Sequence, residues 1–291
     1  MTAEHPSRVL VTGGSGFIGQ RLVRALLGTG AEVTVADRRA PTEPGVRPVV
    51  GDLRDPSVAA QAVSPGTDAI FHLAAITSVL KSLDDPVDTY ETNVAVTASL
   101  LELARTLGVG SFLLASTNAV VGDVGRTVIT EQSPLRPLTP YGATKAAGEM
   151  MVSCYTAAYG IKGCALRFSN VYGPGMQHKD SFVPRLMRAA ASGQGVQIYG
   201  DGTQVRDLIH VDDIVSALLL AWRTGHTGSV IVAAGESVTV NDIIAAARAL
   251  GYQPTHDLKS GIATVWPEFA GEPASEATGE PADGVKGEAA Q

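Results

Sequence analysis

The stretch VTGGSGFIGQ at residues 11–20 decides the fold, because its glycines permit a tight backbone turn between a strand and a helix. Gly14, Gly16 and Gly19 form the spacing G-x-G-x-x-G, and replacing Gly14 by Gly13 gives G-x-x-G-x-x-G. With either spacing the backbone can approach a pyrophosphate, which then lies at the N-terminal end of the helix that follows. We therefore expect a dinucleotide site at the start of the chain.

Short apolar runs alternate with amphipathic segments downstream of this loop. The alternation predicts an α/β fold, namely a Rossmann-type doubly wound parallel sheet. The helices are expected from 17 onward and over 87–109, 141–160 and 182–193. The strands are expected over 8–12, 31–39, 47–55, 68–75, 111–117 and 162–175, the last of which opens into a loop.

The elements become shorter and more separated after the sixth strand. This change predicts a dinucleotide-binding domain over 1–169 with parts of 205–235, and a smaller C-terminal substrate-binding cap over 170–204 and 236–269. Residues 270–291 consist mostly of Gly, Pro, Ala, Glu and Ser, with almost nothing to bury, so a disordered tail is expected there.

The composition excludes several kinds of partner. The 291 residues carry a formal net charge of −7, with acidic and basic residues mixed, so no basic stripe exists for nucleic acid or a membrane surface. The N-terminus has no signal-peptide pattern and the longest apolar run is too short to span a bilayer, so we expect a cytoplasmic protein. Cys154 and Cys164 lack metal-ligand spacing, so we expect reduced core residues and no metal site.

Asp37 ends the second strand about 20 residues after the glycine loop, where a carboxylate can accept hydrogen bonds from the adenosine ribose. A carboxylate there would repel a 2′-phosphate, which favours NAD over NADP. Arg38 and Arg39 leave NADP open, because arginine at this place can accommodate the phosphate.

The pentapeptide YGATK places Tyr141 and Lys145 four residues apart at the start of a helix, so their side chains share a face. The lysine ammonium can lower the pKa of the phenol and also hold the nicotinamide ribose. Ser116 and Thr117 end the fifth strand, where open α/β sheets bind ligands, and a hydroxyl there can contact the substrate oxygen that Tyr141 deprotonates.

These motifs together resemble a known family. TGGSGFIG, GDLRD, HLAA, YETNV, YGATK, LRFSNVYGPG and YGDGTQVRDLIHVDDI occur, over about 8–220, in the order typical of extended short-chain dehydrogenases/reductases. The chain most resembles their NAD-dependent epimerase/dehydratase branch, which acts on nucleotide sugars and includes UDP-glucose 4-epimerase. The resemblance favours the G-x-x-G-x-x-G spacing.

The resemblance implies a role for each matching residue. Thr117, Tyr141 and Lys145 would be catalytic, with Tyr141 as the general base, and Thr117, Asn118, Tyr141, Asn170 and Arg206 would bind substrate. Alternatives remain: Asn93 could cap or bridge helices, and Arg206 could pair with Asp207 or Asp213. His210 with Asp212 and Asp213 more simply starts a helix than binds a metal. NAD would be bound by Tyr141 and Lys145 together with Gly13, Gly16, Phe17, Ile18, Gly19, Asp37, Arg38, Asp52, Leu53, Leu73, Ala74, Ala75 and Asn93.

The chain departs from the family pattern at three places. The 4,6-dehydratases follow the catalytic threonine with Asp-Glu, whereas Asn118 and Ala119 stand here, so dehydration by that pair is not expected. Val121 replaces an aromatic residue expected near the sugar. After Leu250 one strand-loop-helix unit with a second phosphate-binding arginine is absent from the sequence, so the cap is expected to be abridged.

We therefore expect an NAD-dependent epimerase of a nucleotide diphosphate sugar, most simply a 4-epimerase. One alternative is an NAD(P)-dependent reductase or dehydrogenase of a sugar or secondary-metabolite ketone. Another is a catalytically impaired dinucleotide-binding protein. The resemblance also allows a homodimer.

Overall fold

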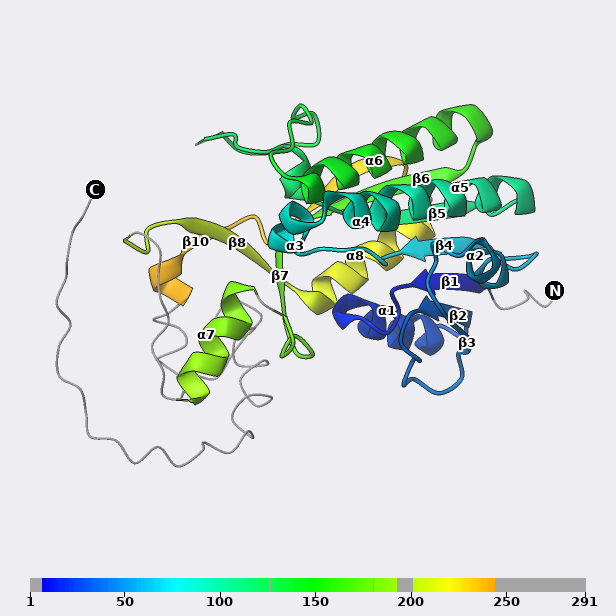
Figure 1. Ribbon diagram of the computed structural model, residues 1–291, viewed down its shortest axis with the longest axis horizontal. Helices are drawn as coiled ribbons and strands as arrows, with labels where there is room; N and C mark the ends of the chain where they lie inside the picture. The colour runs from blue at the N-terminus through cyan, green and yellow to red at the C-terminus, as the bar shows by residue number, and fades with distance from the viewer. Residues whose placement is uncertain (1–6, 126, 180, 193–200, 244–291) are drawn as a thin grey trace.

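A seven-stranded parallel sheet forms the centre of the protein, whose computed structural model describes residues 7–125, 127–179, 181–192 and 201–243 (Figure 1). The strand order is β3-β2-β1-β4-β5-β6-β9, so the chain adds strands on one side of β1 as far as β3 and then on the other side from β4 onward. A crevice opens at the carboxyl ends of β1 and β4, where this order switches. The strands are β1 (Arg8–Thr12), β2 (Glu32–Asp37), β3 (Arg47–Val50), β4 (Ala69–His72), β5 (Ser111–Thr117), β6 (Lys162–Phe168) and β9 (Gly228–Val232).

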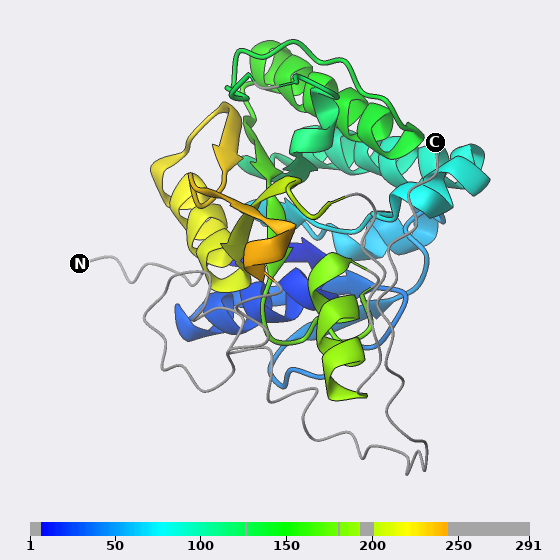
Figure 2. The same ribbon diagram turned by 90° about the vertical axis from the view of Figure 1, so that its left-hand side faces the viewer.

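Helices cover both faces of the sheet, as the two views at right angles show (Figures 1 and 2). α1 (Phe17–Gly28) and α8 (Val211–Thr224) pack against each other on one face. On the other face lie α2 (Pro56–Ala62), α5 (Val96–Leu107) and α6 (Pro140–Tyr159). The expected doubly wound α/β fold is therefore confirmed.

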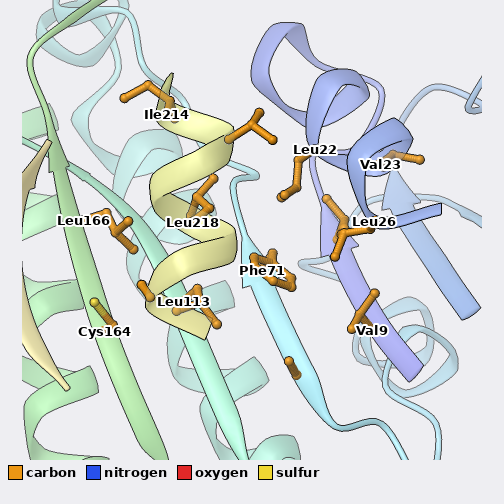
Figure 3. Packing of buried hydrophobic residues seen from close by; sticks show 14 of the residues in the cluster. Val9, Leu22, Val23, Leu26, Phe71, Leu113, Cys164, Leu166, Ile214 and Leu218 are labelled. Atoms are coloured by element: carbon orange, nitrogen blue, oxygen red, sulfur yellow. The ribbon is translucent and has the colours of Figure 1, made fainter. Parts of the chain in front are cut away.

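Alternating strand residues build the two apolar layers, because successive side chains of a strand point to opposite faces. Val9 and Phe71 are buried with Leu22 and Leu218 between the sheet and the α1/α8 layer (Figure 3). Leu10 belongs to the opposite layer, with residues of α2, α5 and α6. Burial on both faces explains why the strands are continuously apolar.

A smaller lobe is built from the chain between β6 and α8 and from the segment after β9. β7 (Asn170–Tyr172), β8 (Val205–His210) and β10 (Ser237–Thr239) form a three-stranded sheet in the order β10-β8-β7, and α7 (Phe182–Ala191) accompanies it. Its apolar cluster includes Tyr172, Met187 and Leu208, and Phe17 at the start of α1 packs against that cluster. The small lobe therefore contacts the end of the glycine loop.

The segment 87–109 differs from the single helix expected there. It comprises the end of α4 (Pro86–Tyr90), a π-helical turn over Glu91–Ala95, and α5. The amide of Val96 bonds the carbonyl of Glu91, five residues back. Such π turns are frequently found at functional sites. Two further helices, α2 and α3 (Val79–Asp84), were not among those expected.

The expectation for one cysteine is wrong. Cys164 is buried, but Cys154 is exposed. Cys154 follows the buried Val152 by two residues on α6, which is about 200° around the helix, so it faces solvent. The expected tail and the abridged segment after Leu250 lie outside the described residues. No helix in the described part of the chain is long and apolar enough to cross a bilayer.

The glycine loop needs its glycines because three backbone segments meet there. Gly13 has φ of +71°, and a Cβ on it would lie 2.7 Å from the amide nitrogen of Ala74. A Cβ on Gly19 would overlap the carbonyl oxygen of Gly13. Gly14 has a different reason, since its Cβ would lie 2.6 Å from Cγ1 of Val35 on β2.

We predict that Gly19→Ala destabilises the protein by about 1–3 kcal/mol, the usual cost of overpacking a dense site. Gly28→Ala is the matched control, because a Cβ on Gly28 of the same helix meets no atom within 4 Å. The control should leave stability unchanged or raise it by up to about 1 kcal/mol. Thermal and urea unfolding of both variants measure the difference, and equal stabilities would refute the backbone-crossing argument.

Candidate active site

A cavity of about 340 Å³ lies where the small lobe meets the carboxyl ends of β1, β4 and β5. Eleven residues expected in the site line it: Gly13, Gly16, Phe17, Ile18, Gly19, Leu73, Ala74, Ala75, Thr117, Tyr141 and Lys145. Gly14 does not line this cavity, which agrees with the G-x-x-G-x-x-G spacing.

The glycine loop fits an anionic group at the start of α1. Gly16 is the N-cap residue of α1, no side chain of the described residues caps that end, and no acidic residue lies in the first turn. The first amides of the helix are therefore left for another acceptor. A Cβ on Gly16 would meet only the carbonyl oxygen of Gly13, at 3.1 Å, so the outer side of Gly16 is open. These features suit a pyrophosphate.

A smaller cavity of about 90 Å³ adjoins the first and shares Gly13, Ala74 and Ala75 with it. Its lining also contains the expected residues Asp37, Arg38, Asp52 and Leu53. The two cavities therefore bring together the residues expected at the adenosine end and those expected at the reactive end of a dinucleotide.

Asp37 fixes the glycine loop as well as lining the smaller cavity. Its carboxylate accepts the amide N–H of Ser15 at 3.0 Å and that of Arg39 at 3.0 Å. Two such bonds leave lone pairs for ribose hydroxyls. Of the two neighbouring arginines, Arg38 lines the cavity, whereas Arg39 donates from its guanidinium to the carbonyl of Ser15 at 2.9 Å.

Tyr141 and Lys145 lie in the first turns of α6 and both face the main cavity. Thr139 caps the helix by accepting the amide N–H of Gly142. Burial raises the pKa of Tyr141, and a hydrogen bond with Thr117 opposes that rise. Thr117 is thus the strand hydroxyl that meets the phenol.

Burial lowers the pKa of Lys145 to about 8, and the charge of Glu149 one turn later opposes the shift. The ammonium donates to the carbonyl of Ala115 at 2.9 Å. A lysine with this pKa is still largely protonated at neutral pH. The pKa of Tyr141 is nevertheless raised overall, and the group that opposes the rise is Thr117, so the lowering of the phenol pKa that was expected from Lys145 is not observed among the described residues.

Glu149 anchors a buried polar cluster behind the site that the sequence did not reveal. The guanidinium of Arg167 donates to its carboxylate at 2.8 and 3.1 Å, and both side chains are almost fully buried. Ser116 donates its hydroxyl to the same carboxylate. Ser116 is therefore committed to Glu149, which leaves Thr117 as the strand hydroxyl available to the site.

A chain of hydrogen bonds runs from β1 through His72 to the π-helical turn. Thr97 donates its hydroxyl to the carbonyl of Asn93 at 2.6 Å, so its oxygen must accept from His72 Nε2 at 2.9 Å. His72 Nδ1 then accepts from the hydroxyl of Thr12 at 2.7 Å. The imidazole is neutral, because complete burial lowers its pKa to about 3.

Asn93 joins the loop after β4 to the active-site helix. Its side chain accepts the amide N–H of Ile76 at 2.8 Å and donates to the carbonyl of Ile76 at 3.0 Å. It also donates to the hydroxyl of Thr144 at 3.1 Å. Asn93 lines neither cavity, so the structure gives it the bridging position.

Three expected substrate residues lie outside the lining of both cavities. Asn118 follows Thr117, and its Oδ1 is buried with no hydrogen-bond partner in the described part of the chain. Asn170 and Arg206 are exposed on the paired strands β7 and β8. Asn170 donates to the carbonyl of Asp207 and Arg206 to that of Val205.

Other sequence expectations also have defined places. Val121 is buried in an apolar cluster with Val120 and does not line the cavity. His210 caps α8 by accepting the amide N–H of Asp212, which confirms the helix-start interpretation. The cavity lining also contains residues that were not expected in the site: Phe168, Ser169, Val171, Met176, Lys179 and Ser181, together with Thr77 and Ala115. Phe168, Ser169 and Val171 lie in the motif LRFSNVYGPG, but the motif does not indicate which of its residues face the cavity. Met176, Lys179, Ser181 and Thr77 lie outside the quoted motifs.

Known proteins share this sequence and architecture. The NAD-dependent epimerase/dehydratase family matches residues 9–234. A dTDP-glucose 4,6-dehydratase of Mycobacterium tuberculosis is 37% identical over 243 residues, covering 79% of this chain and 72% of that protein. A UDP-glucose 4-epimerase of Lacticaseibacillus casei is 33% identical over 292 residues, covering 92% and 86%.

Solved structures of similar proteins have the same architecture. The UDP-glucose 4-epimerase of Thermotoga maritima with UDP-glucose superposes with a TM-score of 0.83 at 28% identity, covering 90% of this chain and 98% of that one. The UDP-glucose 4-epimerase of Thermus thermophilus in complex with NAD gives 0.81 at 32% identity, covering 91% and 100%.

We predict that His72 makes stability fall with acid. Its pKa is about 3 in the folded protein and 6.5 ordinarily. Between these values the unfolded chain binds a proton that the folded protein does not, so stability decreases as pH falls. This group contributes a slope of up to about 1.4 kcal/mol per pH unit. Urea unfolding of the wild type and of His72→Gln from pH 7 to 4 measures it, and parallel curves would contradict the buried neutral imidazole.

Proposed function

Because the chain belongs to the NAD-dependent epimerase/dehydratase family, we propose that it epimerises a nucleotide diphosphate sugar at C4 through a transient keto sugar, with NAD as cofactor. The observation that carries this proposal is that Thr117, Tyr141 and Lys145 line one cavity with the glycine loop. An acid/base group and a dinucleotide cradle thus share one space, as oxidation of a hydroxyl requires. The similar proteins crystallised with UDP-glucose and with NAD support both ligands.

The lining of the cavity favours epimerisation over dehydration. Dehydration needs a further acid and base to remove water from the sugar, and the relatives include 4,6-dehydratases. Among the described residues that line the cavity, none is Asp or Glu. Thr117 is followed by Asn118 and Ala119, which cannot exchange a proton with the sugar in that way.

Each catalytic side chain has a distinct task in this proposal. Thr117 and Tyr141 hold the sugar hydroxyl, and Tyr141 takes its proton and later returns it. Lys145 stabilises the phenolate electrostatically and holds the nicotinamide ribose. Bound NAD supplies the hydride acceptor and the positive charge that offsets the effect of burial on the pKa of Tyr141.

The residues around the ribose favour NAD over NADP. Asp37 lines the adenosine cavity with its carboxylate already bonded to the loop, so it cannot turn away from a 2′-phosphate without releasing Ser15. Arg38 lines the same cavity, but Arg39 is bonded to the loop.

We predict that NAD binds more tightly than NADP, because a 2′-phosphate would meet the charge of Asp37. Titration of both cofactors by nicotinamide or tryptophan fluorescence measures the preference. Asp37→Asn should reduce the difference between the affinities for NAD and NADP. Tighter binding of NADP to the wild type would show that Arg38 decides the specificity instead.

We also predict that Tyr141→Phe lowers turnover by about 10²- to 10⁴-fold with the fold and NAD affinity retained, since only the ionisable oxygen is removed. Tyr155→Phe is the matched control on the same helix, because its hydroxyl contacts Glu102 on the surface. Turnover is followed by chromatography of UDP-, dTDP- and GDP-sugars. Wild-type rates in Tyr141→Phe would remove this tyrosine from the mechanism.

The mass of the product should equal that of the substrate, because epimerisation neither adds nor removes atoms. Mass spectrometry of the same reactions checks this, and NADH absorbance is recorded in parallel. Loss of one water would identify a dehydratase, and stoichiometric NADH would identify a dehydrogenase. Either result would replace the proposal of epimerisation.

A further inference from the structure

The charged side chains that line the main cavity, among the described residues, are all positive. Among the described residues that line it, two are lysines and none is Asp or Glu. Lys145 donates to the carbonyl of Ala115 and belongs to the catalytic group. The second lysine, Lys179, comes from the small lobe and has no role in the chemistry described above.

The backbone that carries Lys179 is held in place by the small lobe. The amide of Lys179 bonds the carbonyl of Met176 at 2.8 Å, which closes a turn. Arg188 of α7 donates to the carbonyls of Gln177 at 2.6 Å and of Lys179 at 3.0 Å. The position of this lysine relative to the cavity is therefore set by the fold.

The same segment lies against the glycine loop. A Cβ on Gly175 would be 3.6 Å from the ring of Phe17, and Met176 and Phe17 share one apolar cluster. Phe17 is the first residue of α1, and its neighbour Gly16 has an open outer side. Lys179 and the amides at the start of α1 thus border the same cavity.

Lys179 has no carboxylate partner among the described residues. The charge that acts on it is that of Arg39, which is bonded to the carbonyl of Ser15 in the glycine loop. Partial burial and this like charge both lower the pKa of Lys179, although the residue as a whole is exposed to solvent. Among the described residues that line the cavity, Lys145 and Lys179 are cationic and none is a carboxylate, and the cavity also borders the uncapped N-terminus of α1. This arrangement is suited to an anion of more than one charge.

We infer that Lys179 is a diphosphate-binding residue. It contacts a diphosphate in the main cavity from the small lobe, on the side opposite the glycine loop. The inference rests on the proposed function, because both ligands of that reaction contain a diphosphate: NAD and the sugar nucleotide.

The experiment measures binding and needs no turnover. Calorimetric titrations of the full chain with ADP-ribose and AMP test the cofactor side, and titrations of the NAD-loaded protein with UDP and uridine test the sugar-nucleotide side. Lys179→Gln should weaken binding of ADP-ribose or UDP by about tenfold, since one charge-assisted contact at a partly solvated site is removed. AMP or uridine, which lack the diphosphate, should lose much less. Lys179→Arg should restore most of the affinity.

Lys162→Gln is the matched control. It removes the same charge from the exposed start of β6, at the other end of that strand from the cavity, and should bind both diphosphates like the wild type. The loss in Lys179→Gln should shrink at high ionic strength. Loss for ADP-ribose alone assigns the contact to NAD, and loss for UDP alone assigns it to the sugar nucleotide.

Unchanged affinity of Lys179→Gln for both diphosphates would overturn the inference and leave the proposed function standing. A wild type that binds neither ADP-ribose nor UDP would overturn both. An equal loss in Lys162→Gln would reduce the effect to net charge and would also overturn the inference.

Discussion

The close crossing of backbones at Gly13 is the constraint on which the site depends. The start of α1 passes directly beneath the carbonyl of Gly13, and the loop after β4 passes Gly13 closely enough to exclude any Cβ. This crossing brings the amides at the start of α1 and residues 73–75 to one space, and Asp37 locks the loop from the side of β2. The dinucleotide cradle can form because Gly13, Gly14 and Gly19 carry no Cβ.

A second constraint acts at α6, which carries its functional side chains at intervals of four residues. Tyr141, Lys145 and Glu149 lie along one face of this helix, and Lys145 and Glu149 are both buried. Burial of Lys145 lowers its pKa, and the nearby Glu149 limits that effect. Glu149 is itself neutralised by Arg167, because an unpaired carboxylate in this setting would be strongly unfavourable. The buried ion pair of Glu149 and Arg167 thus influences the pKa of Lys145 in the site.

The two halves of the sheet are joined by polar groups as well as by apolar packing. The hydrogen bonds from Thr12 through His72 and Thr97 reach Asn93, whose amide then holds both Ile76 and Thr144. Every hydroxyl and ring N–H donor from Thr12 to Thr97 has a single acceptor, so the arrangement has one direction and one imidazole tautomer. The π-helical turn gives Asn93 the position from which it can reach both segments.

The sequence by itself determined the elements whose signals are local. The glycine loop, the alternating strands, Asp37 at the end of β2 and the Tyr141–Lys145 pair are set by spacing along a few turns or one strand. Tertiary structure alone decided which distant groups meet. It paired Glu149 with Arg167, exposed Cys154, left Asn170 and Arg206 outside the cavity lining, and brought Lys179 to the cavity from the small lobe. The physical reason is that periodicity specifies which face of an element is buried, whereas the partner of a buried or cavity-lining polar group depends on the packing of segments that are remote in the chain.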